Sequence, residues 1–170
     1  YEVAGVRVQI DAALNPGNSG GPALVDGKVI GVAFSMLANS QSIGYIIPAE
    51  EIDIFLTDIA DGRYDGKYAI LDELQTLENP ALRDFLKLED SARGLVVTTP
   101  FSDDASYPLR QWDLISKVED TPLDNQGNIL LNGNLKINFS YLVQKLAKKG
   151  TIGLTVIREG RELALSLIHI

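Results

Sequence analysis

The chain has 170 residues, with 15 Lys and Arg against 23 Asp and Glu, which gives a net charge of −8 at pH 7. It contains no cysteine, which excludes disulfides, thiolate metal sites and cysteine nucleophiles. Its one histidine is His169, so a mechanism that needs a histidine base has a single candidate, next to the last residue. The acidic balance disfavours a nucleic-acid surface, and no apolar run approaches the roughly 18 residues of a membrane span.

The first 60 residues predict short strands, a glycine-rich loop and one helix. Residues 14–21 predict the loop, and Asp26-Gly27 predicts a tight hairpin turn. Strands are predicted over residues 6–11, 23–25, 28–34 and 43–47. Pro48 suits the first turn of a helix. The helix is predicted from an apolar stripe of Ile52, Phe55, Leu56 and Ile59.

Residues 61–66 contain two glycines among polar side chains and predict a linker between two domains. After this linker, strands are predicted over residues 68–77, 94–99, 112–118, 152–158 and 161–168. Helices are predicted over 79–88, where Asn79 and Pro80 form a start signal, and over 138–147. Residues 120–136, which are rich in Asp, Asn and Gly, are expected to form a loop. Together these elements indicate a small α+β domain.

The segment with recognisable chemistry is Asn15-Pro-Gly-Asn-Ser-Gly-Gly-Pro22. A serine becomes a useful nucleophile when a base takes its proton and backbone N–H groups stabilise the oxyanion. Glycines allow the sharp turn that presents Ser19 and lets the N–H groups of Gly17 and Ser19 point at one spot. A plain connecting loop is the simpler interpretation, but the length of the string favours the catalytic one. A nucleotide-binding loop is disfavoured because the lysine that would hold phosphate is absent.

The run from Val8 to Pro22 resembles the catalytic-serine segment of the HtrA/Deg family of trypsin-like serine proteases. The runs 29–33 and 43–48 resemble the strands that follow it in that family. Residues 67–170 resemble the PDZ domain that follows the protease, in its plant-type Deg form. The resemblance therefore implies an incomplete, all-β trypsin-like barrel (part of the second lobe) over residues 1–60, a linker over 61–66 and an α+β PDZ-like domain over 67–170.

The resemblance also implies roles for individual residues of the first domain. Ser19 matches the nucleophile, and the N–H groups of Gly17 and Ser19, together with Asn18, match the oxyanion hole. The primary specificity pocket, which is expected to accept small to medium aliphatic side chains, matches Leu14, Phe34, Ser35 and Met36. Singly, Leu14, Phe34 and Met36 could equally pack the barrel.

The catalytic histidine and aspartate of the family lie upstream of the serine and are expected outside this chain, which begins at Tyr1 and looks cut from a longer protein. His169 does not replace the histidine, because it follows the last predicted strand and is more typical of a strand-end surface residue. The 170 residues alone are therefore expected not to hydrolyse peptide bonds.

In the PDZ-like domain, a peptide groove is expected between strand 70–76 and helix 138–147, and its binding residues are expected to be Ala69, Ile70, Leu71 and Tyr141. Leu71 stands where the family has a glycine, and Asp72 stands where it has a hydrophobic residue. An acid at this point disfavours ordinary capture of a C-terminal carboxylate. The domain could instead pack against the protease or a neighbouring subunit as a regulatory element.

Taken as a whole, the resemblance implies an ATP-independent serine endopeptidase that acts on unfolded or misfolded polypeptides in protein quality control. It implies no cofactor and no metal, and a homo-oligomer, commonly a trimer. Bacterial members are periplasmic or exported, and plant members are organellar. The alternative is a PDZ-type scaffold whose protease part is degenerate, and an upstream histidine and aspartate would distinguish the two.

Overall fold

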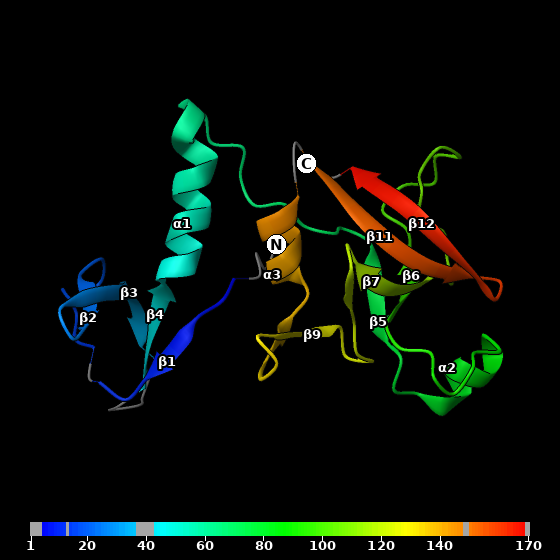
Figure 1. The fold of residues 1–170 in the computed structure, drawn as a ribbon, viewed down its shortest axis with the longest axis horizontal. Helices are drawn as coiled ribbons and strands as arrows, with labels where there is room; N and C mark the ends of the chain where they lie inside the picture. Colours follow the sequence, from blue (N-terminus) through cyan, green and yellow to red (C-terminus); the bar gives the residue numbers. More distant parts are fainter. Residues whose placement is uncertain (1–4, 13, 37–42, 148–149, 169–170) are drawn as a thin grey trace. The chain divides into compact units, whose positions relative to one another are not determined.

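The chain separates into two compact units, Tyr1–Gly66 (unit 1) and Lys67–Ile170 (unit 2), in a computed structural model (Figure 1). The structure describes residues 5–12, 14–36, 43–147 and 150–168. Both units are built mostly from β-strands with a few short helices. None of the helices in these described ranges is long and apolar enough to cross a membrane.

Unit 1 contains a four-stranded antiparallel sheet that holds the ends of the serine loop. The strands run in the order β1 (Val8–Ile10), β4 (Gly44–Pro48), β3 (Lys28–Met36) and β2 (Pro22–Val25). The serine loop connects β1 to β2, and β2 returns into β3 through Asp26 and Gly27, both at positive φ, as the predicted hairpin turn requires. Pro48 ends β4 and leads directly into helix α1 (Ala49–Asp58), which is followed by the short helix η1 (Ile59–Asp61).

The helix of unit 1 buries little of its apolar stripe. Phe55 and Leu56 remain 47% and 52% exposed, and Phe55 meets the ring of Tyr64 at 5.8 Å between centroids. The buried member of α1 is instead Glu51, whose carboxylate accepts the N–H of Val6 at 2.8 Å. This bond ties the segment before β1 to the start of α1.

Unit 2 is organised around a larger antiparallel sheet. Its strands run in the order β12 (Arg161–Ile168), β11 (Thr151–Arg158), β7 (Leu114–Val118), β6 (Leu95–Thr99) and β5 (Glu73–Thr76), and the short β8 (Thr121–Pro122) pairs with β7. A separate hairpin is formed by β9 (Asn128–Leu131) and β10 (Leu135–Asn138). The helices are α2 (Pro80–Phe85) and α3 (Ser140–Leu146).

The core of unit 2 lies between the sheet and helix α2. Leu77, Val96 and Leu114 are fully buried, and a set of partly buried apolar residues packs against them, namely Leu82, Leu86, Leu88, Ala92 and Ile157. The predicted start of α2 is confirmed, because the Asn79 side chain accepts the N–H of Ala81 at 2.9 Å and Pro80 occupies the first turn.

Two expectations for unit 2 are wrong. Residues 120–136 were expected to form a loop, but they contain β8, β9 and the beginning of β10. The turn between β9 and β10 is Asn132-Gly133 with both residues at positive φ, and this dipeptide between apolar residues is a strong hairpin signal. The strand predicted over 68–77 is only Glu73–Thr76, because residues 67–72 pair with no described strand.

Candidate functional site

The serine loop is shaped by two consecutive tight turns. The N–H of Asn18 donates to the Asn15 carbonyl, and the N–H of Gly21 donates to the Asn18 carbonyl, each at 3.0 Å. The loop is joined to β3 by reciprocal bonds, from the Gly20 N–H to the Ala33 carbonyl at 2.8 Å and from the Ala33 N–H to the Gly21 carbonyl at 2.9 Å. Ser19 is therefore presented from a backbone that is fixed on both sides.

The glycines of this loop are required by backbone conformation. Gly17 and Gly20 have φ values of +102° and +86°, which L side chains rarely adopt, although a Cβ at either position would meet nothing within 4 Å. At Gly21 a Cβ would lie 3.0 Å from the Asn18 carbonyl oxygen, so this position is limited by space. A side chain at any of the three positions would disturb the turns that present Ser19.

The hydroxyl of Ser19 is exposed and weakly held. Its Oγ donates to the carbonyl oxygen of Phe34 at 3.3 Å, longer than the usual 2.7–2.8 Å of an O–H···O bond. His169, the one histidine of the chain, lies outside the described residues. The described part of the chain therefore presents the nucleophile without a base.

Two N–H groups beside Ser19 have no described acceptor. Neither the Gly17 N–H nor the Ser19 N–H donates to another residue in the described ranges, whereas the Asn18 N–H is already bonded to Asn15. Exposed N–H groups flanking a serine hydroxyl are the donors that a developing oxyanion needs. This arrangement can stabilise negative charge on a substrate oxygen next to Ser19.

The residues expected in the specificity pocket lie in the same unit. Leu14 is half-buried, and its Cδ1 would stand 2.8 Å from a Cβ at Gly44, so the glycine makes room for it. Phe34 is 50% exposed, and the Arg7 guanidinium lies 5.2 Å from its ring centroid. Ser35 and Met36 belong to β3, but their side chains lie outside what the structure describes.

The candidate peptide-binding residues of unit 2 lie on two different elements. Ala69, Ile70 and Leu71 form a half-buried extended segment before β5, and none of their N–H groups donates to another residue of the described ranges. Tyr141 is buried on α3, with its hydroxyl 3.4 Å from the Lys145 ammonium. The segment 69–71 therefore carries free backbone donors next to a strand that ends the sheet.

Two buried acids of unit 2 were not expected as parts of hydrogen-bonded networks. Asp72 is 7% exposed and accepts the Phe101 N–H at 3.0 Å and the Tyr107 hydroxyl at 2.9 Å. Burial raises the pKa of Tyr107, and the bond to the Asp72 carboxylate raises it further. Sequence reasoning singled out Asp72 only as a departure from the family pattern, since its partners are distant in the chain.

The second buried acid is Asp113, which is 1% exposed. Its carboxylate accepts two bonds of 2.7 Å from the Arg158 guanidinium and one from the Arg110 N–H. The bond to Asp113 raises the pKa of Arg158 above its usual value. This bidentate pair joins the start of β7 to the end of β11 and has a structural role.

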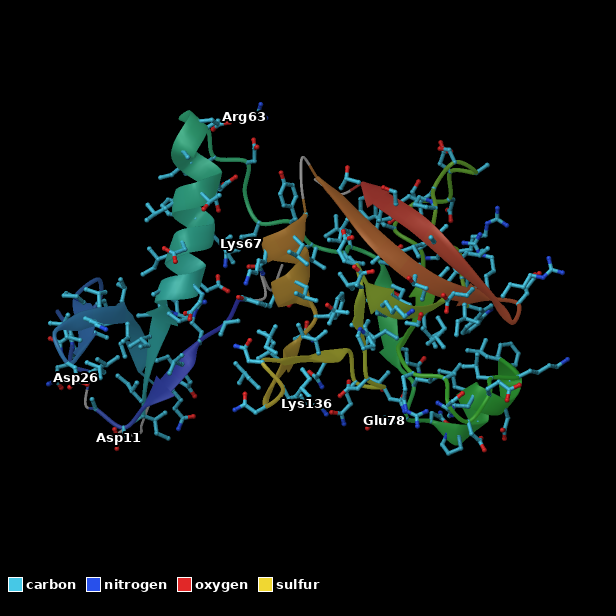
Figure 2. All side chains as sticks on the ribbon, viewed as in Figure 1. Asp11, Asp26, Arg63, Lys67, Glu78 and Lys136 are labelled. Atoms are coloured by element: carbon cyan, nitrogen blue, oxygen red, sulfur yellow. The ribbon has the colours of Figure 1, made fainter. Side chains whose placement is uncertain are left out.

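Exposed charges elsewhere do not form a metal site. Among the residues that the structure describes, no group of three or more His, Asp or Glu side chains could hold a metal ion. Figure 2 shows Lys136 and Glu78, which belong to the polar surroundings of the β9–β10 hairpin. The Lys136 ammonium lies 2.6 Å from the Asp124 carboxylate, and Glu78 accepts the side-chain amide of Gln126 at 2.7 Å.

Comparison with known proteins gives relatives of one kind. No family model matches the chain. It is 37% identical over 160 residues to Protease Do-like 4, mitochondrial, of Arabidopsis thaliana, covering 92% of this chain and 31% of that protein. It is also 37% identical over 165 residues to Protease Do-like 2, chloroplastic, of the same plant, covering 95% of this chain and 27% of that protein. A 90-residue stretch is 50% identical to the Serine protease DegP homolog of Plasmodium falciparum, covering 52% of this chain and 10% of that protein.

Among solved structures, the HtrA-type protease AlgW with decapeptide superposes with a TM-score of 0.67 at 26% identity. The match covers 96% of this chain and 48% of the AlgW chain. The chain thus spans less than a third of the two plant relatives and about half of the solved one. The expected resemblance to the HtrA/Deg family of serine proteases is confirmed, and this chain is a relative of one part of those proteases.

Proposed function

We propose that the chain is the serine-bearing part of an HtrA/Deg-type serine endopeptidase together with its PDZ-like domain. In this proposal residues 1–60 belong to the second lobe of a trypsin-like barrel, residues 61–66 are the linker and residues 67–170 are the PDZ-like domain. The observation that carries the proposal is the geometry of the serine loop, with an exposed Ser19 hydroxyl beside the unbonded N–H groups of Gly17 and Ser19.

The chemistry proposed for this site is acyl transfer. Ser19 Oγ attacks the scissile carbonyl carbon, and its proton passes to a histidine that upstream residues supply. The Gly17 and Ser19 N–H groups hold the oxyanion of the tetrahedral intermediate. When the intermediate collapses, the amine leaves with the proton, and water then hydrolyses the ester to regenerate the Ser19 hydroxyl. Without the histidine and its aspartate, the chain alone is inactive.

The incomplete barrel of unit 1 also supports the proposal. Cross-strand partners Leu24 and Val29 on the β2–β3 hairpin are 59% and 55% exposed. Apolar sheet residues of this kind are buried when a barrel closes. Further strands from the longer protein would cover them. Leu14 and Phe34 would line an apolar pocket that selects small to medium aliphatic residues at the cleavage site.

For the longer protein we propose ATP-independent hydrolysis of unfolded polypeptides in quality control, within a homo-oligomer, commonly a trimer. The names of the plant relatives favour a mitochondrial or chloroplast location. A bacterial source would instead favour the periplasm. The competing function is a peptide-binding scaffold with a degenerate protease part, which the free N–H groups of residues 69–71 support.

The test compares Ser19→Ala with Ser91→Ala, an exposed serine of unit 2, in a protein extended upstream. Hydrolysis of unfolded β-casein is expected to fall by about 10⁴-fold or more in Ser19→Ala and to be unchanged in Ser91→Ala. The 170-residue chain should show no hydrolysis. A Ser19→Ala protein within tenfold of the parent would refute the catalytic role. Hydrolysis by the chain alone that Ser19→Ala abolishes would refute the need for upstream residues.

A further inference from the structure

The start of strand β5 combines free backbone donors with a buried negative charge. Strand β5 ends the sheet of unit 2, so it pairs with β6 on one side and with no described strand on the other. The preceding residues 69–71 are half-buried, and their N–H groups find no acceptor in the described part of the chain. Half-buried N–H groups are normally bonded, so this edge is suited to an added strand.

Asp72 lies between these donors and β5. Its side chain is 7% exposed, and its two oxygens accept one N–H, from Phe101, and one O–H, from Tyr107. Both donors are neutral, and the ion pairs of the described residues do not include Asp72. The carboxylate is therefore held in place at the head of the strand without a cation to offset its charge.

Glu73, the first residue of β5, adds a second acid at the same point. Its carboxylate accepts the Thr99 hydroxyl at 2.7 Å, and its carbonyl accepts the Thr98 hydroxyl at 3.0 Å. A peptide that ended here with a free carboxylate would bring a third negative charge close to these two. Like charges at this range disfavour each other, whereas a neutral carbonyl of a continuing chain would meet the free donors without that repulsion.

We propose that the β5 edge of unit 2 binds an internal, extended segment of a polypeptide and discriminates against a free C-terminal carboxylate. The inference deepens the peptide-binding part of the proposed function and rests on it. Main-chain bonds along Glu73–Thr76 and at the N–H groups of residues 69–71 would supply the affinity. Asp72 acts as the selecting residue through its fixed charge, which Tyr107 and Phe101 hold at the head of the strand.

The experiment uses the full chain with Ser19→Ala, so that binding is measured independently of hydrolysis. The probes are fluorescein-labelled decapeptides with aliphatic last residues, each made as a free acid and as a C-terminal amide. Fluorescence polarisation is expected to give a dissociation constant for the amides that is at least about tenfold lower than for the matched acids. Amide NMR shifts are expected to concentrate on Glu73–Thr76 and the preceding three residues.

Asp72→Asn is the decisive variant, because an asparagine can still accept the Phe101 N–H and donate to the Tyr107 oxygen while it removes the charge. It should bring the affinities of acid and amide to within about threefold of each other, since the charge causes the difference. Glu162→Gln, an equal charge loss at the opposite edge of the sheet on β12, should leave the difference unchanged.

Tighter binding of the free acids, an unchanged preference in Asp72→Asn, or no binding of either form would each overturn the proposal. Loss of hydrolysis by the longer protein would bear only on the proposed protease function, because every binding measurement here is made with the Ser19→Ala chain.

Discussion

The two units differ in how much apolar surface they bury. In the described part of unit 1, the buried apolar side chains are Ala33 and Ile46. Unit 2 instead buries a continuous set that includes Leu77, Val96 and Leu114. Unit 1 is thus shaped mainly by backbone hydrogen bonds and turns, whereas unit 2 has a core of its own. The comparison teaches that the candidate catalytic serine lies in the unit with less apolar stabilisation of its own.

The largest expected effect tests the ion pair that joins β7 to β11. Arg158→Ala leaves Asp113 buried at 1% exposure without its guanidinium, and we expect a loss of about 4 kcal/mol in the free energy of unfolding of unit 2. Urea unfolding followed by the fluorescence of Trp112, the one tryptophan, measures it. Lys117→Ala, which breaks the exposed 4.0 Å pair with Glu162, is the control and should cost less than about 0.5 kcal/mol. Equal losses would contradict a special role for the buried pair.

The next effect tests the core of unit 2 directly. Leu114 is fully buried between the sheet and α2, so Leu114→Ala removes packing and leaves a cavity. We expect a loss of about 3 kcal/mol in the free energy of unfolding. The same urea experiment measures it, and a loss below about 1 kcal/mol would show that this core is loosely packed.

A smaller effect concerns pH. Burial alone would raise the pKa of Asp124, but the bond from Lys136 and those from the Asn128 and Gln126 N–H groups lower it to about 2. Because the folded pKa lies below the unfolded one, this contribution to stability is present above about pH 4 and is lost as the pH falls towards 2. The Asp124 side chain is 33% exposed, so solvent screening limits the contribution to about 1 kcal/mol.

Asp124→Asn is expected to remove this part of the acid dependence. Urea unfolding between pH 5 and pH 2 would show it as a flatter decline of stability in the variant than in the parent. Parallel curves would mean that Asp124 has the same pKa in the folded and unfolded chains.

The smallest expected effect is the matched truncation in unit 1. Leu24 is 59% exposed on β2, so Leu24→Ala should change the stability by less than about 0.5 kcal/mol. Hydrogen exchange of the β3 amides, measured at low protein concentration, reports on this unit. A large acceleration would show that the β2–β3 face is packed in solution, for example against a second copy, and would remove the contrast between the units.

Local features of the chain were readable from the sequence where one residue type satisfies one backbone need. Gly17 and Gly20 take positive φ in the serine loop, Asp26-Gly27 forms the hairpin turn, and Asn79 caps α2. The β9–β10 hairpin was also readable, because its Asn132-Gly133 turn carries the same kind of signal. The acidic and amide-rich composition of residues 120–136 obscured it.

Other features depend on residues that are far apart in the chain. The N–H of Val6 reaches Glu51, so an acid in the apolar stripe region of α1 is buried while Phe55 stays half exposed. Periodicity identifies a helix, but it does not say which face finds a partner. The short extent of β5 has a related cause, since strand assignment requires a partner and residues 67–72 have none in the described sheet.

The sequence by itself determined the serine loop and the resemblance to the HtrA/Deg proteases, because that loop consists of neighbouring residues whose conformational preferences and chemistry act locally. Only the tertiary structure decided what Asp72 and Asp113 do. Tyr107 reaches Asp72 across 35 positions and Arg158 reaches Asp113 across 45, and such pairs form only when the packing of the sheet brings their strands and loops together. An acid that departs from a family pattern in the sequence becomes, in the folded unit, a fixed charge at the head of an open strand edge.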